Sequence, residues 1–452
     1  MPSTDNQHLY RTFFRLTLPL MLQQLLVALI NFLDIMMITR LGVLPVAGVG
    51  LANQVYYLFI MINFGLFSGI GVLLAQFWGK QDLPNFHRSL GLGLSLGMGA
   101  AVIIAIFSIL LPAQLLSLLT QDSAAVASGT KYLMITAFSY PFTALSFGLG
   151  SALRSIGKPV SALISALTAL SLNAGLNYIL IFGKLGMPML GVEGAAIGTL
   201  VARVVEAGLL LFLVRWKFPQ LLAKLDQLLN FSKTMVRHVF RVCAPVLVNE
   251  IFWALGMIVY VVAYGLVSTE ALAVSQVAGM VQNLFAIIGI SMGNAAAVFI
   301  GQGIGRGDLE QVKDFARRFM RISLVSGIIT AVVMYYSIPL IIKILEPDQL
   351  IVESLRLTLM VFAVLFPVKT MGCVLIIGVF RGGGNTRYAM LLELACVWLL
   401  GVPLAFIGAQ LLQLPIHWLI LLINAEEILK VIIGLVHMRK RKWIRDITTV
   451  VA

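Results

Sequence analysis

Asp34 is the side chain whose position in this sequence most needs a chemical explanation. It lies inside an apolar run from Leu16 to Thr39. The run is long enough to cross a lipid bilayer, because a spanning helix needs about 20 residues. A carboxylate inside such a helix costs roughly 2.5–3.5 kcal/mol on insertion scales, so it marks a candidate functional site. In that position it could take up a proton or bind a cation.

Two asparagines in a later apolar run could complete a polar pocket around this carboxylate. Asn173 and Asn177 are four residues apart, so they lie on one face of a helix. Their amides can donate hydrogen bonds to a carboxylate, and their carbonyl oxygens can bind Na⁺. The alternative is hydrogen bonding between helices, worth about 0.6 kcal/mol per bond in a membrane. Hydrogen bonding between helices would explain each asparagine by itself, but it gives no reason for a charged side chain at Asp34.

A second polar set lies in an apolar run of the second half. Asn249 and Glu250 are adjacent, and Trp253 follows Glu250 at i+3 on the same helix face. An acid beside an aromatic face suits an organic cation, through charge attraction and cation–π contact. The other interpretation is an ion pair between Glu250 and Lys369 that bridges two spans as a structural contact or a gate. The sequence leaves both interpretations open.

Other charged residues within apolar runs have simpler interpretations. Arg203 and Glu206 are i, i+3 neighbours, which favours a structural ion pair on one helix, and Glu426 with Lys430 is interpreted in the same way. Glu393 has no obvious partner, and its role is left open.

Methionine and aromatic residues near Asp34 complete the candidate pocket. Most of the 19 Met and 26 Phe residues are expected to face lipid or the core. A cavity lined by such side chains can also adapt to varied hydrophobic ligands. Met37, Tyr56 and Tyr57 flank the Asp34 region and are the candidates for this role.

The composition requires most of the chain to lie in lipid. Of its 452 residues, 60% are hydrophobic and 11% are charged, whereas a soluble globular chain has about 25% charged residues. The net charge of +13 does not indicate a nucleic-acid partner, because the charges lie between apolar runs rather than on one basic face. All three cysteines lie within apolar runs, so no extracellular disulfide framework is expected.

Twelve apolar runs predict an all-α integral membrane protein with twelve transmembrane helices. The runs lie near residues 12–39, 46–78, 89–118, 130–153, 160–182, 191–214, 242–267, 271–302, 320–344, 357–380, 387–411 and 415–437. Of the 32 Lys and Arg residues, 24 fall in the two termini and in alternate connections. By the positive-inside rule this asymmetry predicts a multi-pass protein of the plasma membrane, with both termini in the cytoplasm.

The second half of the chain repeats the first. Residues 75–82 align with 301–308 at an offset of 226 (302 − 76), and Pro141 aligns with Pro367 at the same offset. Residues 154–157 align with 381–384 after one inserted residue. Two halves that run in the same direction are related by an axis along the membrane normal, and transporters of this design bind substrate near the midplane between the halves.

We therefore predict two pseudo-symmetric six-helix bundles. Residues 1–216 form the first bundle and 239–438 the second. A cytoplasmic linker at 217–238 joins the bundles, and a basic cytoplasmic tail follows at 439–452.

Several segments together resemble the multidrug and toxic compound extrusion (MATE) family, in particular its bacterial efflux transporters. The segments are NAGLNY at 173–178, LGVEGAA at 190–196, the region 301–308, and RGGGNTR at 381–387. The likeness covers almost the whole chain. It implies export of amphipathic, often cationic, compounds in exchange for H⁺ or Na⁺.

The resemblance also implies roles for particular residues. A first-span acid that works with polar fifth-span residues forms the coupling-ion site of the family, which carries over to Asp34, Asn173 and Asn177. A seventh-span acid is frequent in the family and matches Glu250. Some Na⁺-coupled members use a tenth-span acid, but Lys369 occupies that region here, so we expect H⁺ rather than Na⁺.

The sequence thus predicts a secondary active antiporter that works by alternating access. We expect no enzyme activity, no cofactor besides the coupling ion, and a monomer that contacts lipid and small-molecule substrates. One alternative is a flippase for a lipid-linked precursor, which would be expected to line its cavity with several cations. Another is a non-coupled channel or receptor.

Overall fold

The computed structural model describes residues 3–224, 227–228, 230–440 and 442–449. Within these ranges every regular element is a helix. Each of the twelve predicted apolar runs lies in one helix or in consecutive helices, which confirms the all-α membrane fold. The predicted linker and tail each include residues outside the described ranges, namely 225–226, 229, 441 and 450–452.

The helices of the first half follow one another with short connections. They are α1 (Ser3–Thr39), α2 (Val43–Lys80), α3 (Leu83–Leu110), α4 (Pro112–Ser117), α5 (Ser123–Ala137), α6 (Tyr140–Ser155), α7 (Pro159–Phe182) and α8 (Gly191–Lys217). A short 3₁₀ turn, η1 (Pro219–Leu221), follows α8.

The helices of the second half include three π-helical segments. The α-helices are α10 (Lys233–Val267), α11 (Thr269–Gly305), α12 (Leu309–Leu345), α13 (Gln349–Cys373), α14 (Thr386–Ala395), α15 (Val402–Phe406), α16 (Ile416–Ile423) and α17 (Ala425–Arg439). The π-helical segments are η2 (Val374–Arg381), η3 (Cys396–Gly401) and η4 (Ile407–Leu411).

Ten described helical segments are long and apolar enough to cross a membrane, or eleven if α5 and α6, bent by 50°, form one span. The last predicted run does not pass this criterion as one helix, because it is interrupted at Asn424 between α16 and α17. The second piece also carries Glu426, Glu427 and Lys430 near its start. The interruption and these charges together explain why length and apolarity fail to identify the twelfth span.

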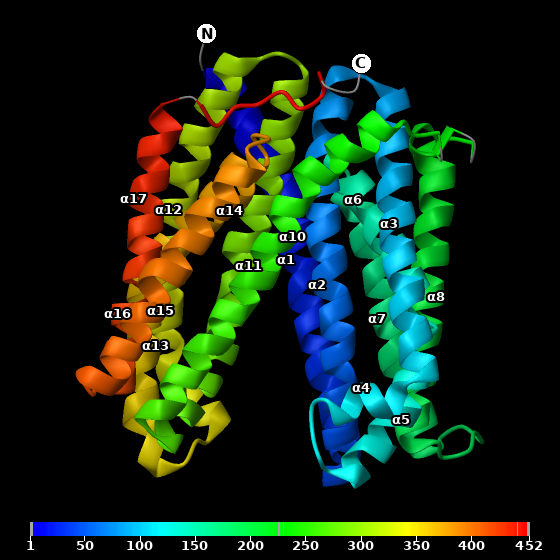
Figure 1. Cartoon of the computed structure of the whole chain (residues 1–452), viewed down its shortest axis with the longest axis vertical. Coiled ribbons are helices and arrows are strands. Elements are labelled where there is room, and N and C mark those ends of the chain that lie inside the picture. Colours follow the sequence, from blue (N-terminus) through cyan, green and yellow to red (C-terminus); the bar gives the residue numbers. More distant parts are fainter. Residues whose placement is uncertain (1–2, 225–226, 229, 441, 450–452) are drawn as a thin grey trace.

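The helices form two bundles that touch at one end of the molecule and diverge at the other (Figure 1). Contact at the closed end depends on glycines of the repeated segments. A Cβ atom at Gly79 would lie 2.2 Å from the backbone oxygen of Gln302, and one at Gly305 would lie 2.0 Å from the backbone oxygen of Gln76. The backbones of α2 and α11 can approach this closely only because these positions lack side chains.

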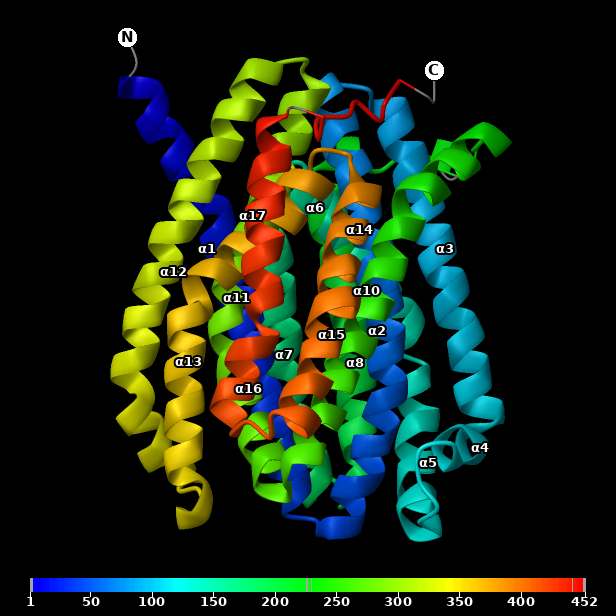
Figure 2. The ribbon, with the colours of Figure 1, turned by 60° about the vertical axis from the view of Figure 1, so that its left-hand side comes forward.

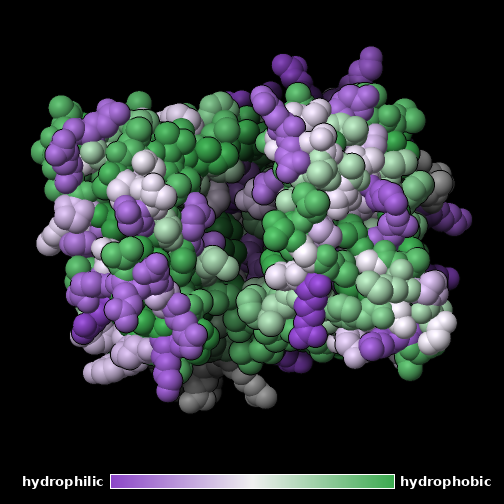
Figure 3. All heavy atoms as spheres, turned by 90° about the horizontal axis from the view of Figure 1, so that it is seen from below, coloured by the Kyte–Doolittle hydropathy of each residue, from purple (hydrophilic) through white to green (hydrophobic). Residues whose placement is uncertain are grey.

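The other end of the molecule is hollowed between the two bundles. Figure 3 looks onto this end and shows a central depression, flanked by two bodies with many hydrophobic residues on their surfaces. The connection from α4 to α5 lies at this end on one side, and the connection from α12 to α13 lies at this end on the other (Figure 1).

Two helices, α1 and α10, belong to both bundles. The first part of α1 packs into the core of the second half, where Phe13 stacks on Phe319 at 4.6 Å between ring centroids. Farther along α1, Ile38 belongs to a core cluster of the first half. In the same way α10 places Cys243 in the core of the first half and Tyr260 in the second. Helix α1 therefore begins against the second half and ends in the first, and α10 begins against the first half and ends in the second.

The repeat is visible in the structure at residue level. Pro19 lies inside α1 and Pro245 inside α10, at the same offset of 226 (245 − 19). The one-residue insertion before Arg381 coincides with the π-helical segment η2. A π-helical turn contains one more residue than an α-helical turn, so η2 accommodates the inserted residue without a loop.

Candidate functional site

Asp34 on α1 meets the asparagines of α7, as the sequence suggested. The side-chain nitrogen of Asn177 donates to Asp34 Oδ1 at 2.9 Å. Asn173 satisfies both ends of its amide when its nitrogen donates to Asp34 Oδ2 at 3.0 Å and its oxygen accepts from the Thr199 backbone nitrogen at 3.2 Å. Each oxygen of the carboxylate then has one amide donor.

Helix α8 closes this polar site from the other side. A Cβ atom at Gly198 would lie 2.2 Å from Asn177 Oδ1, so the glycine makes room for the amide. That same oxygen is buried without a hydrogen-bond donor among the described residues. The site therefore contains one amide oxygen that can still accept a hydrogen bond, on a residue bonded to Asp34.

The charged pair on α8 was also expected from the sequence. Arg203 Nη1 lies 2.7 Å from Glu206 Oε2, an i, i+3 ion pair. Arg203 also acts electrostatically on Asp34 and on Tyr56, so its positive charge belongs to the same neighbourhood. Sequence reasoning assigned the pair to structure and missed its closeness to Asp34, because spacing along one helix does not show what faces the next helix.

The three hydrophobic candidates near Asp34 lie in different environments. Met37 packs against a core cluster of the first half, and the Tyr56 ring lies 5.6 Å from that of Tyr140. Tyr57 is half exposed and interacts electrostatically with Glu250 of the other half. Of the three, Tyr57 is the one that the structure relates to both halves.

Glu250 forms an ion pair with Arg381, which corrects the alternative of a Glu250–Lys369 pair. Arg381 Nη1 lies 2.6 Å from Glu250 Oε1, and Arg381 Nη2 lies 3.5 Å from Glu393 Oε2. The π-helical segment η2 ends at Arg381, whose side chain is almost fully buried.

The other candidates of this region have different neighbours. Asn249 donates to Glu393 Oε2 at 2.7 Å and so joins the buried charges. Trp253 packs in an apolar cluster with Tyr260. Lys369 lies 5.6 Å from the centre of the Phe362 ring and within electrostatic range of two glutamates on α17.

The expected Glu426–Lys430 pair is wrong by one residue. Lys430 Nζ lies 2.9 Å from Glu427 Oε1, at i, i+3, and 3.6 Å from Glu393 Oε1. Glu426 instead accepts a hydrogen bond from the Tyr260 hydroxyl at 2.7 Å. All three residues lie on α17, and the hydroxyl of Tyr260 on α10 occupies Glu426.

Tyr260 occupies the position that corresponds to Asp34 in the repeat (260 − 34 = 226). In the first half the first helix supplies the acid and α7 supplies the donors. In the second half the equivalent helix supplies a hydroxyl donor and α17 supplies the acid. The two halves therefore carry different polar chemistry at equivalent depth, and Asp34 has no acidic equivalent on α10.

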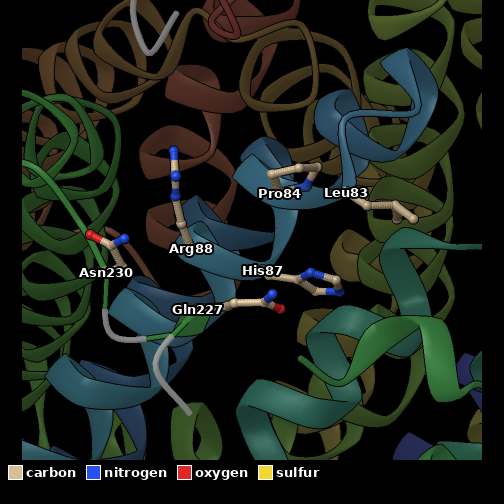
Figure 4. Close-up of a pocket in the computed structure, with 6 residues that line it drawn as sticks. All are labelled: Leu83, Pro84, His87, Arg88, Gln227 and Asn230. Atoms are coloured by element: carbon tan, nitrogen blue, oxygen red, sulfur yellow. The ribbon is translucent and has the colours of Figure 1, made fainter. Parts of the chain in front are cut away.

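A separate cavity of about 350 Å³ lies outside this region, at the closed end (Figure 4). It is lined by Leu83, Pro84, His87, Arg88, Gln227 and Asn230. Its lining comes from the start of α3 and the linker, away from Asp34 and Glu250. Among the described residues, no group of three or more His, Cys, Asp and Glu side chains could hold a metal ion.

The MatE family model matches residues 19–179 and 245–407, which is most of both halves. The chain belongs to the MATE family. This is a family of transporters, not a class of enzymes, and its members are multi-pass membrane proteins.

Named relatives extend the likeness over nearly the whole chain. A probable multidrug resistance protein NorM of Bradyrhizobium diazoefficiens is 27% identical over 409 residues, covering 87% of this chain and 85% of that protein. A probable multidrug resistance protein YoeA of Bacillus subtilis is 24% identical, covering 90% and 88%.

Solved structures of transporters share the fold. A crystal structure of a mutant of the Vibrio cholerae MATE transporter VcmN superposes with a TM-score of 0.89 at 19% identity, covering 98% of this chain and 99% of that one. A MOP-superfamily transporter from Pyrococcus furiosus gives a TM-score of 0.85 at 20% identity, covering 97% and 96%. The predicted fold of two six-helix bundles is therefore confirmed.

Proposed function

We propose that this MATE-family protein is a secondary active antiporter that exports amphipathic, often cationic, organic compounds in exchange for H⁺. Export of drugs is supported by the names of the NorM and YoeA relatives, both probable multidrug resistance proteins. The protein would act as a monomer in the plasma membrane, with both termini in the cytoplasm. The described parts of the two terminal segments lie at the same end of the molecule, in keeping with this orientation (Figure 1).

The observation that carries the proposal is the contact between Asp34 and Asn177. The two residues lie on different membrane helices, and the bond between them is 2.9 Å long. A charged Asp34 accepts the amide donors of α7, which holds α1 against α7. Protonation removes the charge and turns one acceptor oxygen into a donor, so the amides of α7 must rearrange. The protonation state of Asp34 thereby changes the packing of α1, the helix that also inserts into the core of the second half.

The shape of the molecule supplies the second part of the mechanism. With the termini in the cytoplasm, the hollow in Figure 3 faces outward and the glycine contacts of α2 and α11 close the cytoplasmic side. Proton uptake at Asp34 from outside would favour release of the substrate and a return to the inward-facing state. The bundles then rock about the midplane, as in other transporters built from parallel repeats.

The test is dye efflux from proteoliposomes in which ΔpH and a Na⁺ gradient are imposed separately. We expect ΔpH alone to drive efflux and Asp34→Asn to abolish it while the protein stays folded. Glu193→Gln is the matched control, because it neutralises an exposed carboxylate of the same half that pairs with Lys131. Normal coupled efflux by Asp34→Asn would contradict the proposal. Efflux that requires a Na⁺ gradient would show that Na⁺, rather than H⁺, is the coupling ion.

The structure gives little support to the flippase alternative. Such a protein would present several cationic side chains to a pyrophosphate in the central hollow. Arg203, Arg381 and Lys430 are instead bound to carboxylates inside the bundles. A non-coupled channel would show flux that follows the substrate gradient alone, and the same efflux assay distinguishes it.

A further inference from the structure

The tail after α17 runs across the closed end from the second bundle to the first (Figure 2). We call residues 442–449 the strap. At its start the strap is fastened to the second half. Trp443 is almost fully buried in the core of that half, and its indole nitrogen donates to Met438 O at 3.0 Å. The backbone nitrogen of Arg445 donates to Gly383 O at 2.8 Å.

Glycines of the RGGGNTR turn make this attachment possible. A Cβ atom at Gly383 would lie 2.6 Å from the Trp443 ring, and one at Gly384 would lie 2.5 Å from Arg445 O. Gly384 also has a φ of +80°, a left-handed conformation that favours glycine. The RGGGNTR turn is thus the part of the second half to which the strap binds.

Two residues later the strap is fastened to the first half. The fully buried amide of Gln76 on α2 accepts from Ile447 N at 2.9 Å and donates to Arg445 O at 3.1 Å. His238 Nε2 lies 2.7 Å from Ile447 O, and Lys80 Nζ donates to Thr448 Oγ1 at 3.1 Å. The Ile447 side chain is buried in the core cluster of the first half.

The distance between the two attachments is too short to absorb an opening motion. Arg445 is itself bonded to both halves, through its backbone nitrogen to Gly383 and through its backbone oxygen to Gln76. Only Asp446 separates it from Ile447, which is bonded to the first half. A residue of extended chain spans at most about 3.6 Å, so the strap has no slack. If the bundles part at the closed end, one of the two sets of contacts must break.

We propose that the strap is a latch that holds the two bundles together at the closed end, and that it must detach from Gln76 and the first half before the molecule opens there. Trp443 anchors the strap in the second half, so the attachment through Ile447 and Thr448 is the one that breaks. This inference deepens the proposed function, because it adds a control on the alternation between the two open states.

The test measures the separation of the bundles at the hollow end in lipid nanodiscs, without substrate or ion gradient. Spin labels are placed at Leu118, which caps the end of α4, and at Leu350, at the start of α13; both side chains are highly exposed. The end of α4 and the start of α13 lie at the hollow end, in different halves (Figure 1). The three native cysteines are first replaced by alanine. The distances are measured by double electron–electron resonance in the full chain and in a chain that ends after Asp446. A chain that ends after Thr449 is the matched control, because it keeps every strap contact described above.

Without the latch we expect the hollow end to close more often. Loss of a buried isoleucine with its backbone bonds should shift the ratio of long to short distances by about tenfold or more. The full-length Ile447→Ala variant should shift it in the same direction, and Thr449→Ala should not. Unchanged distance distributions in both the shortened chain and Ile447→Ala would overturn the proposal.

A cross-link tests the latch from the opposite direction. Lys80→Cys and Thr448→Cys, joined by a reducible bifunctional methanethiosulfonate reagent, should hold the long-distance state and stop efflux until the reagent is reduced. The distances separate this proposal from the proposed function. If efflux is coupled to ΔpH but the strap variants leave the spin-label distances unchanged, only the latch proposal is wrong. If the distances shift but neither the parent protein nor any variant exports dye, only the antiport proposal is wrong.

Discussion

At the scale of single residues, the second half contains the larger store of buried charge. Glutamates of α10, α14 and α17 lie among three cations, and ion pairs of 2.6 to 3.6 Å link most of them. The set consists of Glu250, Glu393, Glu426, Glu427, Arg381, Lys430 and Lys369. Buried ion pairs add little net stability compared with apolar residues, but removing one partner is costly because the other charge stays buried. Neutralising one of these acids should therefore reduce stability by an amount that depends on whether it leaves a buried cation without a partner.

Glu427 and Glu426 provide a matched comparison. Glu427→Gln leaves Lys430 with the longer contact to Glu393 alone, so we expect a loss of about 3 kcal/mol or more in the free energy of unfolding. Glu426→Gln keeps an oxygen to accept from Tyr260, so its loss should be about 1 kcal/mol. Thermal unfolding of both variants in the same detergent measures the difference. Equal melting temperatures would show that Lys430 does not depend on Glu427.

At the scale of elements, close approach of helices depends on glycines at a few positions. Gly79, Gly305 and Gly198 each lie where a Cβ atom would meet a neighbouring atom at 2.2 Å or less. Gly50, also on α2, faces open space, because a Cβ atom there would meet no neighbouring atom within 4 Å. The same substitution should consequently have opposite outcomes on one helix.

Gly79→Ala should push α2 away from α11, because the obstacle is the backbone oxygen of Gln302, which no side-chain rotation can relieve. We expect lower thermal stability and a shift of the Leu118–Leu350 spin-label distance toward closure at the hollow end. Gly50→Ala should be neutral or slightly stabilising, since alanine favours helix by about 1 kcal/mol over glycine. If both variants behave alike, the α2–α11 contact does not hold the closed end.

At the scale of the whole molecule, orientation decides whether the hollow faces the outside. The proposed orientation puts Leu118 and Leu350 outside the cell and Thr448 in the cytoplasm. Single cysteines at these positions, in a background without native cysteines, should differ in labelling by a membrane-impermeant maleimide. We expect labelling of intact cells at Leu118→Cys and Leu350→Cys, and labelling of Thr448→Cys only after the membrane is opened. The reverse labelling pattern would show that the hollow faces the cytoplasm.

Much of the architecture could be predicted from the sequence, for physical reasons. Apolar runs of spanning length force helices, because backbone groups in lipid must bond within their own segment. The offset of 226 residues shows two like halves, and the i, i+4 spacing of Asn173 and Asn177 places them on one face. A lone carboxylate in an apolar run is so costly that Asp34 stands out without any knowledge of its neighbours.

Contacts between helices could be decided only by the tertiary structure. Spacing along one helix cannot show which side chain of another helix faces it, so Glu250 met Arg381 rather than Lys369. Two further contacts depend on neighbouring helices in the same way. Arg381, the last residue of η2, is buried against Glu250 of α10. Glu426 binds Tyr260 of α10, and Lys430 pairs with Glu427 instead. The strap was hidden for a related reason. A short basic tail carries no periodic pattern, and its hold on Gln76 exists only because the folded bundles bring residues 76 and 447 together.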